Sequence, residues 1–451
     1  MSVEPYREIT FDKDGDGPAG QSAALTALAR QGVTDLVLLA HGWNNSPSGA
    51  TRLCSDFFAP FPGLFGPGVE AGYAGVIWPS MIFTDEPVPD YRALVTVLPE
   101  KEPVLVRLTE LLVLAPPEEA AFVEFGELLR ELTDVYEVGD GIGGGDEDGG
   151  GIGIGGGGDG DGIGGVGAVG AEGFVGAEGF VGASAAVPEF LVADPVAVCA
   201  RFTEALEETG GTVPPEGFGE GLKRYWKGAR EALRQAAYYV MKRRAGRVGE
   251  FGLGPLLGEV ARTAPGLRVH LVGHSMGARL VAYALRGLPP GARPVASVTL
   301  LQGAFSHYAF APRLPHDPRR PGALRDMQHR VRGPLVACYS RHDTALGVMY
   351  PLASRLAGDS ESLAGPLSGQ LAGPLTGLLG ADDPRWGAIG HDGVKAVPGT
   401  VERTLAAVLR EGVPGSGCVS VDAADAVRSH SDIVRPELAR VVVSAARAGR
   451  A

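Results

Sequence analysis

One serine lies between glycines in a setting suited to nucleophilic chemistry. Gly273-His274-Ser275-Met276-Gly277 fits the pattern G-x-S-x-G. It directly follows the apolar run 267–272 and directly precedes the helical pattern 278–286. A strand, sharp turn and helix in this order expose a serine Oγ above a sheet, so Ser275 is a candidate nucleophile. The alternative is a glycine-rich turn in which Ser275 only caps the following helix.

A serine nucleophile needs a base, and the base needs an orienting acid. His430 follows the apolar run 418–421, and Asp343 directly follows the run 334–339. The chain order serine, aspartate, histidine is that of one known arrangement of such triads. Rival acids are Asp392, Asp422 and Asp425. The last two lie too close to His430 in sequence to approach its ring easily, and Asp392 has glycine neighbours and nothing in the sequence to fix its position.

His41-Gly42-Trp43 directly follows the apolar run 35–40. A tight turn there can direct a backbone N–H into the site, so the amides of Trp43 and Met276 are expected to form an oxyanion hole. In the alternative, this is a plain turn in which His41 packs locally.

The remaining histidines have weaker claims to a role. His307 and His274 are candidate pocket residues, as are His41 and Gly42, whereas His391 and His342 fit loop positions better. No His, Asp or Glu residues have the spacing of metal ligands, so we expect neither a metal nor another cofactor.

Short apolar runs alternate with helical patterns along most of the chain, which predicts a doubly wound, mostly parallel α/β sheet. The runs expected to be strands are 35–40, 75–78, 267–272, 295–301, 334–339 and 418–421. Helices are expected over 105–114, 120–132, 226–244 and 278–286. Ser275, Asp343 and His430 each follow a strand, and parallel sheets place their sites at that edge.

These segments together resemble the α/β-hydrolase fold, and more narrowly a group of bacterial serine hydrolases. The resemblance rests on HGWNN at 41–45, MKRRAGRVG at 241–249, HLVGHSMGARL at 270–280, CYSRHD at 338–343 and RSHSDI at 428–433. It covers roughly 30–80, 222–350 and 400–440. It implies Ser275 as nucleophile, His430 as base and Asp343 as the orienting acid, but it implies no substrate.

The expected hydrolase core is divided into 1–80 and 222–451, with a loop excursion at 351–400. The segment 81–221 is expected to be one large inserted cap or lid. Within it, 139–183 holds 23 Gly and eight acids with no Lys or Arg, which predicts a flexible loop. A calcium-binding repeat is the less favoured alternative, because the register of the pattern is one residue off.

Composition limits the partners of this chain. Its 451 residues have a formal net charge of −13, which argues against nucleic-acid binding. Four widely spaced cysteines suit a reducing compartment, and we expect neither a signal peptide nor a membrane span. We therefore expect a cytoplasmic location.

The basic stretch 223–247 is expected to be a helix with a solvated face. Attraction to an anionic substrate or a membrane surface is the less favoured interpretation.

The expected function is a serine hydrolase, an esterase or lipase-like enzyme that acts on a small-molecule acyl substrate through an acyl-enzyme. The competing hypothesis is a non-catalytic binding or scaffold protein of the same fold. Such a protein has usually lost a member of the triad, and the candidate set here is complete.

Overall fold

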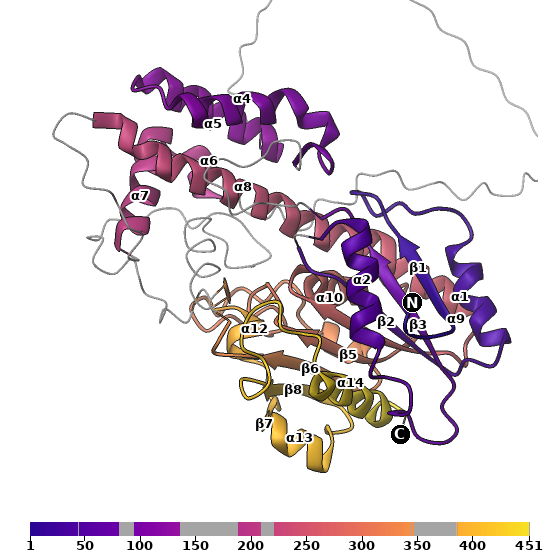
Figure 1. The fold of residues 1–451 in the computed structure, drawn as a ribbon. Helices are drawn as coiled ribbons and strands as arrows, with labels where there is room; N and C mark the ends of the chain where they lie inside the picture. The colour runs from indigo at the N-terminus through magenta and orange to yellow at the C-terminus, as the bar shows by residue number, and fades with distance from the viewer. Residues whose placement is uncertain are drawn as a thin grey trace, which may run out of the picture.

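The computed structural model describes residues 1–43, 45–80, 94–135, 188–208, 221–343, 345–346, 385 and 387–450. Within these residues, eight strands form one sheet in the order β1-β3-β2-β4-β5-β6-β8-β7 (Figure 1). All neighbouring strands are parallel. The strands are β1 (Tyr6–Thr10), β2 (Asp35–Ala40), β3 (Ala71–Ile77), β4 (Arg268–His274), β5 (Val295–Leu301), β6 (Pro334–Tyr339), β7 (Val401–Thr404) and β8 (Gly417–Asp422).

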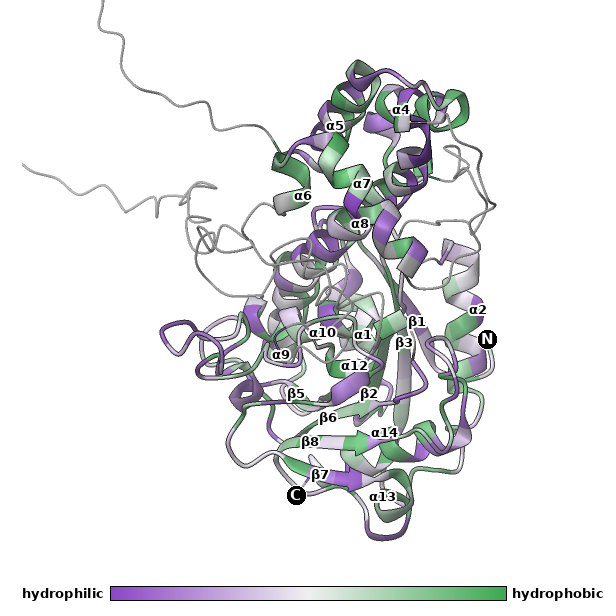
Figure 2. Cartoon of the chain, turned by 90° about the vertical axis from the view of Figure 1, so that its left-hand side faces the viewer, coloured by the Kyte–Doolittle hydropathy of each residue, from purple (hydrophilic) through white to green (hydrophobic). Residues whose placement is uncertain are grey.

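Helices cover both faces of the sheet, so the protein belongs to the α/β class, as predicted. On one face lie α1 (Gln21–Arg30), α9 (Gly254–Thr263) and α10 (Met276–Gly287). On the other lie α2 (Pro47–Phe58), α13 (Leu405–Glu411) and α14 (Pro436–Ala448). In Figure 2, α14 carries both hydrophobic and hydrophilic residues, as expected of a helix with one buried face.

The central strands are mostly apolar because both of their faces are buried. In β2, Leu36 and Leu38 belong to the core beneath α1, α9 and α10. Val37 and Leu39 alternate with them and belong to the core beneath α2 and α14. All six predicted strands are present. The two that sequence analysis missed, β1 and β7, lie at the sheet edges, where polar and part-exposed residues break the apolar pattern.

The segment between β3 and α8 forms a separate helical layer beside the sheet (Figure 1). Its described helices before α8 are α4 (Glu102–Leu114), α5 (Glu119–Thr133), α6 (Glu189–Val192) and α7 (Pro195–Glu208), with short turns η1 (Pro99–Lys101) and η2 (Gly221–Tyr225). The predicted flexible loop 139–183 lies outside the described residues, and so do positions 351–384 and 386 of the predicted loop excursion 351–400. None of the described helices is both long and apolar enough to cross a bilayer.

The long helix α8 (Trp226–Arg247) joins this layer to the sheet. At its start, Trp226 stacks on Phe122 of α5, with ring centroids 4.4 Å apart. Near its end, the carbonyl of Lys242 accepts a hydrogen bond from Arg279 Nε of α10, at 2.9 Å. Lys242 and Arg244 are buried. The prediction of a solvated basic face is therefore wrong for these two residues, because α8 is covered from two sides.

The chain continues from α8 through a π-helical turn, η3 (Val248–Leu253), into α9. A Cβ on Gly249 would overlap the carbonyl oxygen of Leu280 in α10, and one on Gly287 would overlap that of Glu250. Only glycine allows these backbones to approach so closely. Through this packing α10 lies close against η3, and the turn at Ser275 stands at the start of α10.

Two short elements complete the described fold. They are the turn η4 (Met327–Arg330) and the helix α12 (Ile389–Asp392).

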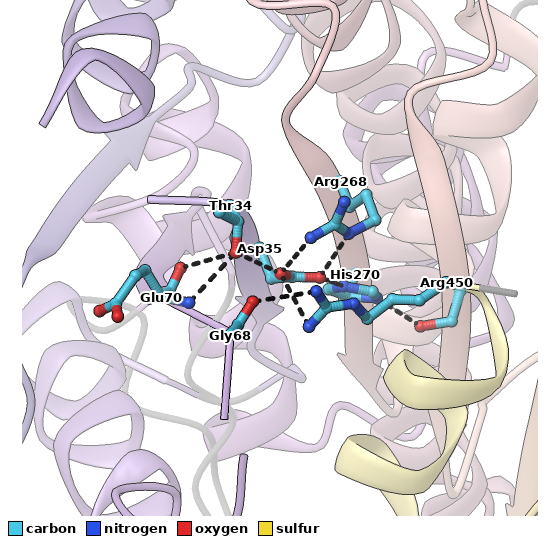
Figure 3. A network of polar contacts seen from close by, with 8 residues as sticks. Thr34, Asp35, Gly68, Glu70, Arg268, His270 and Arg450 are labelled. Atoms are coloured by element: carbon cyan, nitrogen blue, oxygen red, sulfur yellow. Dashed lines mark hydrogen bonds and ion pairs between the residues drawn. The ribbon is translucent and has the colours of Figure 1, made fainter. Parts of the chain in front are cut away.

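A buried polar network fastens the amino ends of β2 and β4 (Figure 3). The fully buried Asp35 carboxylate accepts two hydrogen bonds from Arg268, at 2.9 and 2.8 Å, and one from His270 Nε2 at 3.0 Å. Burial alone would raise the pKa of Asp35, but its hydrogen bonds from His270 and Arg268 hold it well below its usual value. Arg450 also approaches Asp35, at 3.6 Å, which ties the C-terminal segment to the sheet.

Candidate active site

Ser275 occupies the sharp turn between β4 and α10. Its backbone has φ 55° and ψ −119°, a conformation that costs a non-glycine residue about 1–3 kcal/mol. Its N–H donates to the carbonyl of Leu301 at the end of β5, at 3.0 Å, and its own carbonyl accepts from Ala304. The strained turn is thus held in place by the neighbouring strand.

The glycines of the motif are required by close backbone contacts. A Cβ on Gly277 would overlap the carbonyl oxygens of Ala40 and His41, which end β2 and begin its turn. A Cβ on Gly273 would overlap the backbone of Gly277 and Ala278. The two glycines therefore let the serine turn lie directly against the loop that follows β2.

Ser275, His430 and Asp343 form a continuous hydrogen-bonded chain. His430 Nε2 lies 2.8 Å from Ser275 Oγ, and His430 Nδ1 lies 2.7 Å from Asp343 Oδ2. The three residues follow β4, β8 and β6, so they meet at the carboxyl edge of the sheet. The expected hydrogen bond between Asp343 and His430 is confirmed.

The carboxylate fixes which tautomer of His430 is present. An ionised carboxylate only accepts hydrogen bonds, so Nδ1 carries the proton and Nε2 offers a lone pair to the serine hydroxyl. Asp343 is fully buried, and its second oxygen accepts from the Leu346 N–H at 3.1 Å. The side chain of His430 remains 26% exposed.

Asp392, the rival acid, is held elsewhere. Its carboxylate accepts from His307 Nδ1 at 3.0 Å and from His391 Nδ1 at 2.8 Å. Burial would raise the pKa of Asp392, but these two hydrogen bonds hold it below its usual value. The expectation that nothing fixes Asp392 is therefore wrong, although it does not pair with His430. His307, a candidate pocket residue, is buried against this carboxylate.

His274 links the serine turn to the loop that carries the base. Its Nε2 donates to the backbone carbonyl of His430 at 2.8 Å, and the two rings lie 5.1 Å apart. Burial, together with the nearby His430, lowers the pKa of His274 to about 3, so the ring is neutral. Its buried Nδ1 has no hydrogen-bond partner among the described residues.

His41 shapes the loop after β2. Its Nδ1 donates to the carbonyl of Gly42 at 2.9 Å, and its Nε2 accepts from the backbone N–H of Trp78 at 3.3 Å. The Trp78 indole donates to the carbonyl of His41 at 2.9 Å and stacks on its ring. Burial lowers the pKa of His41 to about 4, so the ring stays neutral. The contact of Trp78 with His41 was not predicted from the sequence. The position of Trp78 at the end of a strand was the only indication that it lies near the site.

The loop after β2 passes close to Ser275. A Cβ on Gly42 would lie 2.9 Å from Ser275 Cβ and 2.8 Å from His274 Nδ1. The backbone N–H groups of Trp43 and Met276 donate no hydrogen bond to any described residue. The indole of Trp43 packs edge-on against Tyr238 of α8, with ring centroids 5.6 Å apart. Met276 directly follows Ser275, and Trp43 directly follows Gly42, so both residues are next in the chain to groups at the serine turn.

No protein-family model, curated protein or solved structure matches this chain. Among the described residues, no three His, Cys, Asp or Glu side chains are grouped so that they could hold a metal ion. The chemistry of the site therefore has to be inferred from the geometry of Ser275, His430 and Asp343.

Proposed function

We propose that this chain is a serine hydrolase of the α/β-hydrolase type that cleaves an ester of a small molecule through an acyl-enzyme. One observation carries the proposal. The hydroxyl of Ser275, both ring nitrogens of His430 and the carboxylate of Asp343 lie in one hydrogen-bonded chain, and Ser275 itself lies on a strained turn before a helix. This combination is what a serine nucleophile requires.

In the first half of the reaction, Ser275 Oγ attacks the acyl carbon while its proton passes to His430 Nε2. Asp343 stabilises the imidazolium that forms, and it keeps the proton of Nδ1 in place. When the tetrahedral intermediate collapses, the bond to the leaving alcohol breaks. His430 gives its proton to that oxygen, which leaves the acyl group on Ser275 as an ester.

In the second half, His430 takes a proton from water and the hydroxide attacks the acyl-enzyme. Collapse of the second intermediate releases the acid and returns the proton to Ser275 Oγ. The negative oxygen in both intermediates needs donors that are already in place. The amides of Trp43 and Met276, which donate to no described residue, fit this role, and the N-terminus of α10 adds a favourable potential.

The experiment is covalent labelling of the full chain with a fluorophosphonate, followed by peptide mass analysis. We expect one phosphonylated residue, Ser275. Ser275→Ala should abolish labelling and lower kcat on p-nitrophenyl esters of graded chain length by on the order of 10⁴- to 10⁶-fold. The matched control is Ser429→Ala, which removes an exposed hydroxyl beside His430 and should keep both label and activity.

Two results would contradict the proposal. Absence of labelling in a folded wild-type chain that also hydrolyses no ester would favour the non-catalytic alternative. A Ser275→Ala variant that keeps more than about a tenth of the activity would place the nucleophile at another residue.

A further inference from the structure

A cleft lies between the inserted helices and the sheet domain, apart from Ser275. It has a volume of about 100 Å³, room for on the order of seven to ten waters. Its walls are the loop after β1, the turn η1, the end of α5 and the last two turns of α8. The lining residues are Lys13, Asp14, Leu98, Glu100, Lys101, Leu132, Thr133, Asp134, Val240, Arg243, Arg244 and Arg247.

Charged groups dominate this lining. Five of the residues are basic and three are acidic, a surplus of two positive charges in a chain whose net charge is −13. Two of the acids are already neutralised. Asp14 pairs with Lys13 at 2.9 Å and with Arg247 at 3.1 Å, and Asp134 pairs with Lys101 at 2.6 Å. The third acid, Glu100, forms no ion pair within the described residues.

Arg244 is the most buried charged residue of this lining, and it has no charged partner at ion-pair distance within the described residues. The residue is only 5% exposed, and its Nη1 donates to two uncharged acceptors, the carbonyls of Pro79 at 3.0 Å and Val97 at 3.2 Å. Its Nε and Nη2 form no hydrogen bond, and no carboxylate lies within ion-pair distance, in the described part of the chain. Burial lowers the pKa of Arg244 to about 10, so it is still charged at neutral pH.

Glu100, Asp14 and Asp12 attract the Arg244 guanidinium from beyond ion-pair distance, and none of the three accepts a hydrogen bond from it. A buried charge is costly unless it is paired at close range, and an anion in the cleft would accept those hydrogen bonds directly. The free edge of a guanidinium offers two parallel N–H donors, which match two oxygens of a phosphate. Arg243, whose Nη1 donates to the carbonyl of Thr133 at 3.2 Å, adds a second guanidinium to the same wall. The surplus of two positive charges matches a dianion better than a single carboxylate.

We propose that this cleft binds a phosphate dianion, either inorganic phosphate or the phosphate group of a small metabolite, with Arg244 at its centre. The site is independent of the proposed hydrolase chemistry. Because its walls come from α5, α8 and the loop after β1, a bound phosphate would join the inserted helices to the sheet domain. Binding should therefore stabilise the folded chain.

The test is calorimetry and thermal unfolding of the full chain in sodium phosphate, with sodium chloride of equal ionic strength as the reference. Glycerol 3-phosphate forms a second arm, which distinguishes a phosphate ester from the free ion. We expect saturable binding of at least one of the two, with a matching rise in melting temperature. Binding that does not saturate, or an equal rise in chloride, would overturn the proposal.

Variants locate the site. Arg244→Gln should weaken phosphate binding about tenfold or more, the size expected for losing a hydrogen-bonded charge. Should that variant fail to fold, the double variant Arg243→Gln/Arg247→Gln replaces it, because both side chains are exposed. The control is Arg52→Gln on α2, whose side chain is 86% exposed and which should bind as the wild type does. Equal affinity in all folded variants would overturn the assignment.

Discussion

The imidazole of His274 donates a hydrogen bond to the backbone carbonyl of His430, at 2.8 Å. The residue before the proposed nucleophile thereby holds the loop that carries the proposed base. Ser275 is attached to β4, whereas His430 lies on a loop after β8, three strands away in the sheet. This hydrogen bond therefore acts as a positioning contact between two elements that move independently in the unfolded chain.

Removing this donor should affect rate more than binding. We expect His274→Phe to lower kcat by roughly ten- to a hundredfold with a smaller change in KM, because the base is then less well oriented. His274→Gln, which keeps an N–H donor, should recover part of the loss. Steady-state kinetics on a p-nitrophenyl ester measures both. A change in KM alone would instead make His274 a substrate contact.

Acid should destabilise the fold through buried neutral histidines. The pKa values of His41 and His274 are lowered to about 4 and about 3, so between those values and pH 6.5 the unfolded chain binds more protons than the folded one. Stability should thus rise with pH across this window, with His41 alone contributing about 3 kcal/mol. His391 opposes the trend, because the neighbouring Asp392 raises its pKa.

Urea denaturation at pH 4.5, 5.5 and 6.5 measures this slope. Burial lowers the pKa of His270 as well. His274→Gln removes one of these three buried histidines, so its free energy of unfolding should depend on pH less steeply, by close to one proton. A slope equal to that of the wild type would show that His274 does not titrate on unfolding.

Asp343 and Asp392 offer a matched pair of variants, since each carboxylate accepts from a histidine Nδ1. Asp343→Asn should lower kcat by up to about 10⁴-fold by favouring the wrong tautomer of His430, with little loss of fold. Asp392→Asn should leave kcat within about threefold, because its partners His307 and His391 lie outside the triad. The opposite ranking in an esterase assay would transfer the role of acid to Asp392.

Asp35 should matter for stability and not for rate. Asp35→Asn leaves the part-exposed Arg268 and the buried His270 without their carboxylate, a change that costs up to roughly 3–5 kcal/mol, the range for a fully buried pair. The network lies at the amino ends of the strands, opposite Ser275, so kcat of the folded variant should be unchanged. Thr34→Val removes the 2.6 Å hydrogen bond from Thr34 to Asp35 and the hydroxyl's exposed hydrogen bonds with the Glu70 backbone, and it should cost about 1 kcal/mol. Equal losses in urea denaturation would show that the ion pair adds nothing.

Local sequence was sufficient for the elements that carry the site. The buried strands β2, β5 and β6 begin and end at the residues predicted for them, because a strand covered on both faces is a nearly continuous apolar run. The turn at Ser275 was equally predictable, since strand, small residues and amphipathic helix follow one another without a gap. The carboxyl ends of parallel strands lie at one edge of a sheet, and this rule predicted that Asp343 and His430 lie near Ser275.

Tertiary structure decided what depends on residues far apart in the chain. Ser275 and His430 are separated by 155 positions, and only the packing of their loops determines that Asp343, and not Asp392, reaches the imidazole. The burial of Arg244 was likewise hidden, because a basic helix has the same sequence pattern whether solvent or a second helical layer covers it. The edge strands β1 and β7 were also not predicted, because their sequences lack the apolar pattern of the central strands. One side of an edge strand faces no partner, so its residues carry no apolar pattern, and hydrogen bonds to β3 and β8 alone define them.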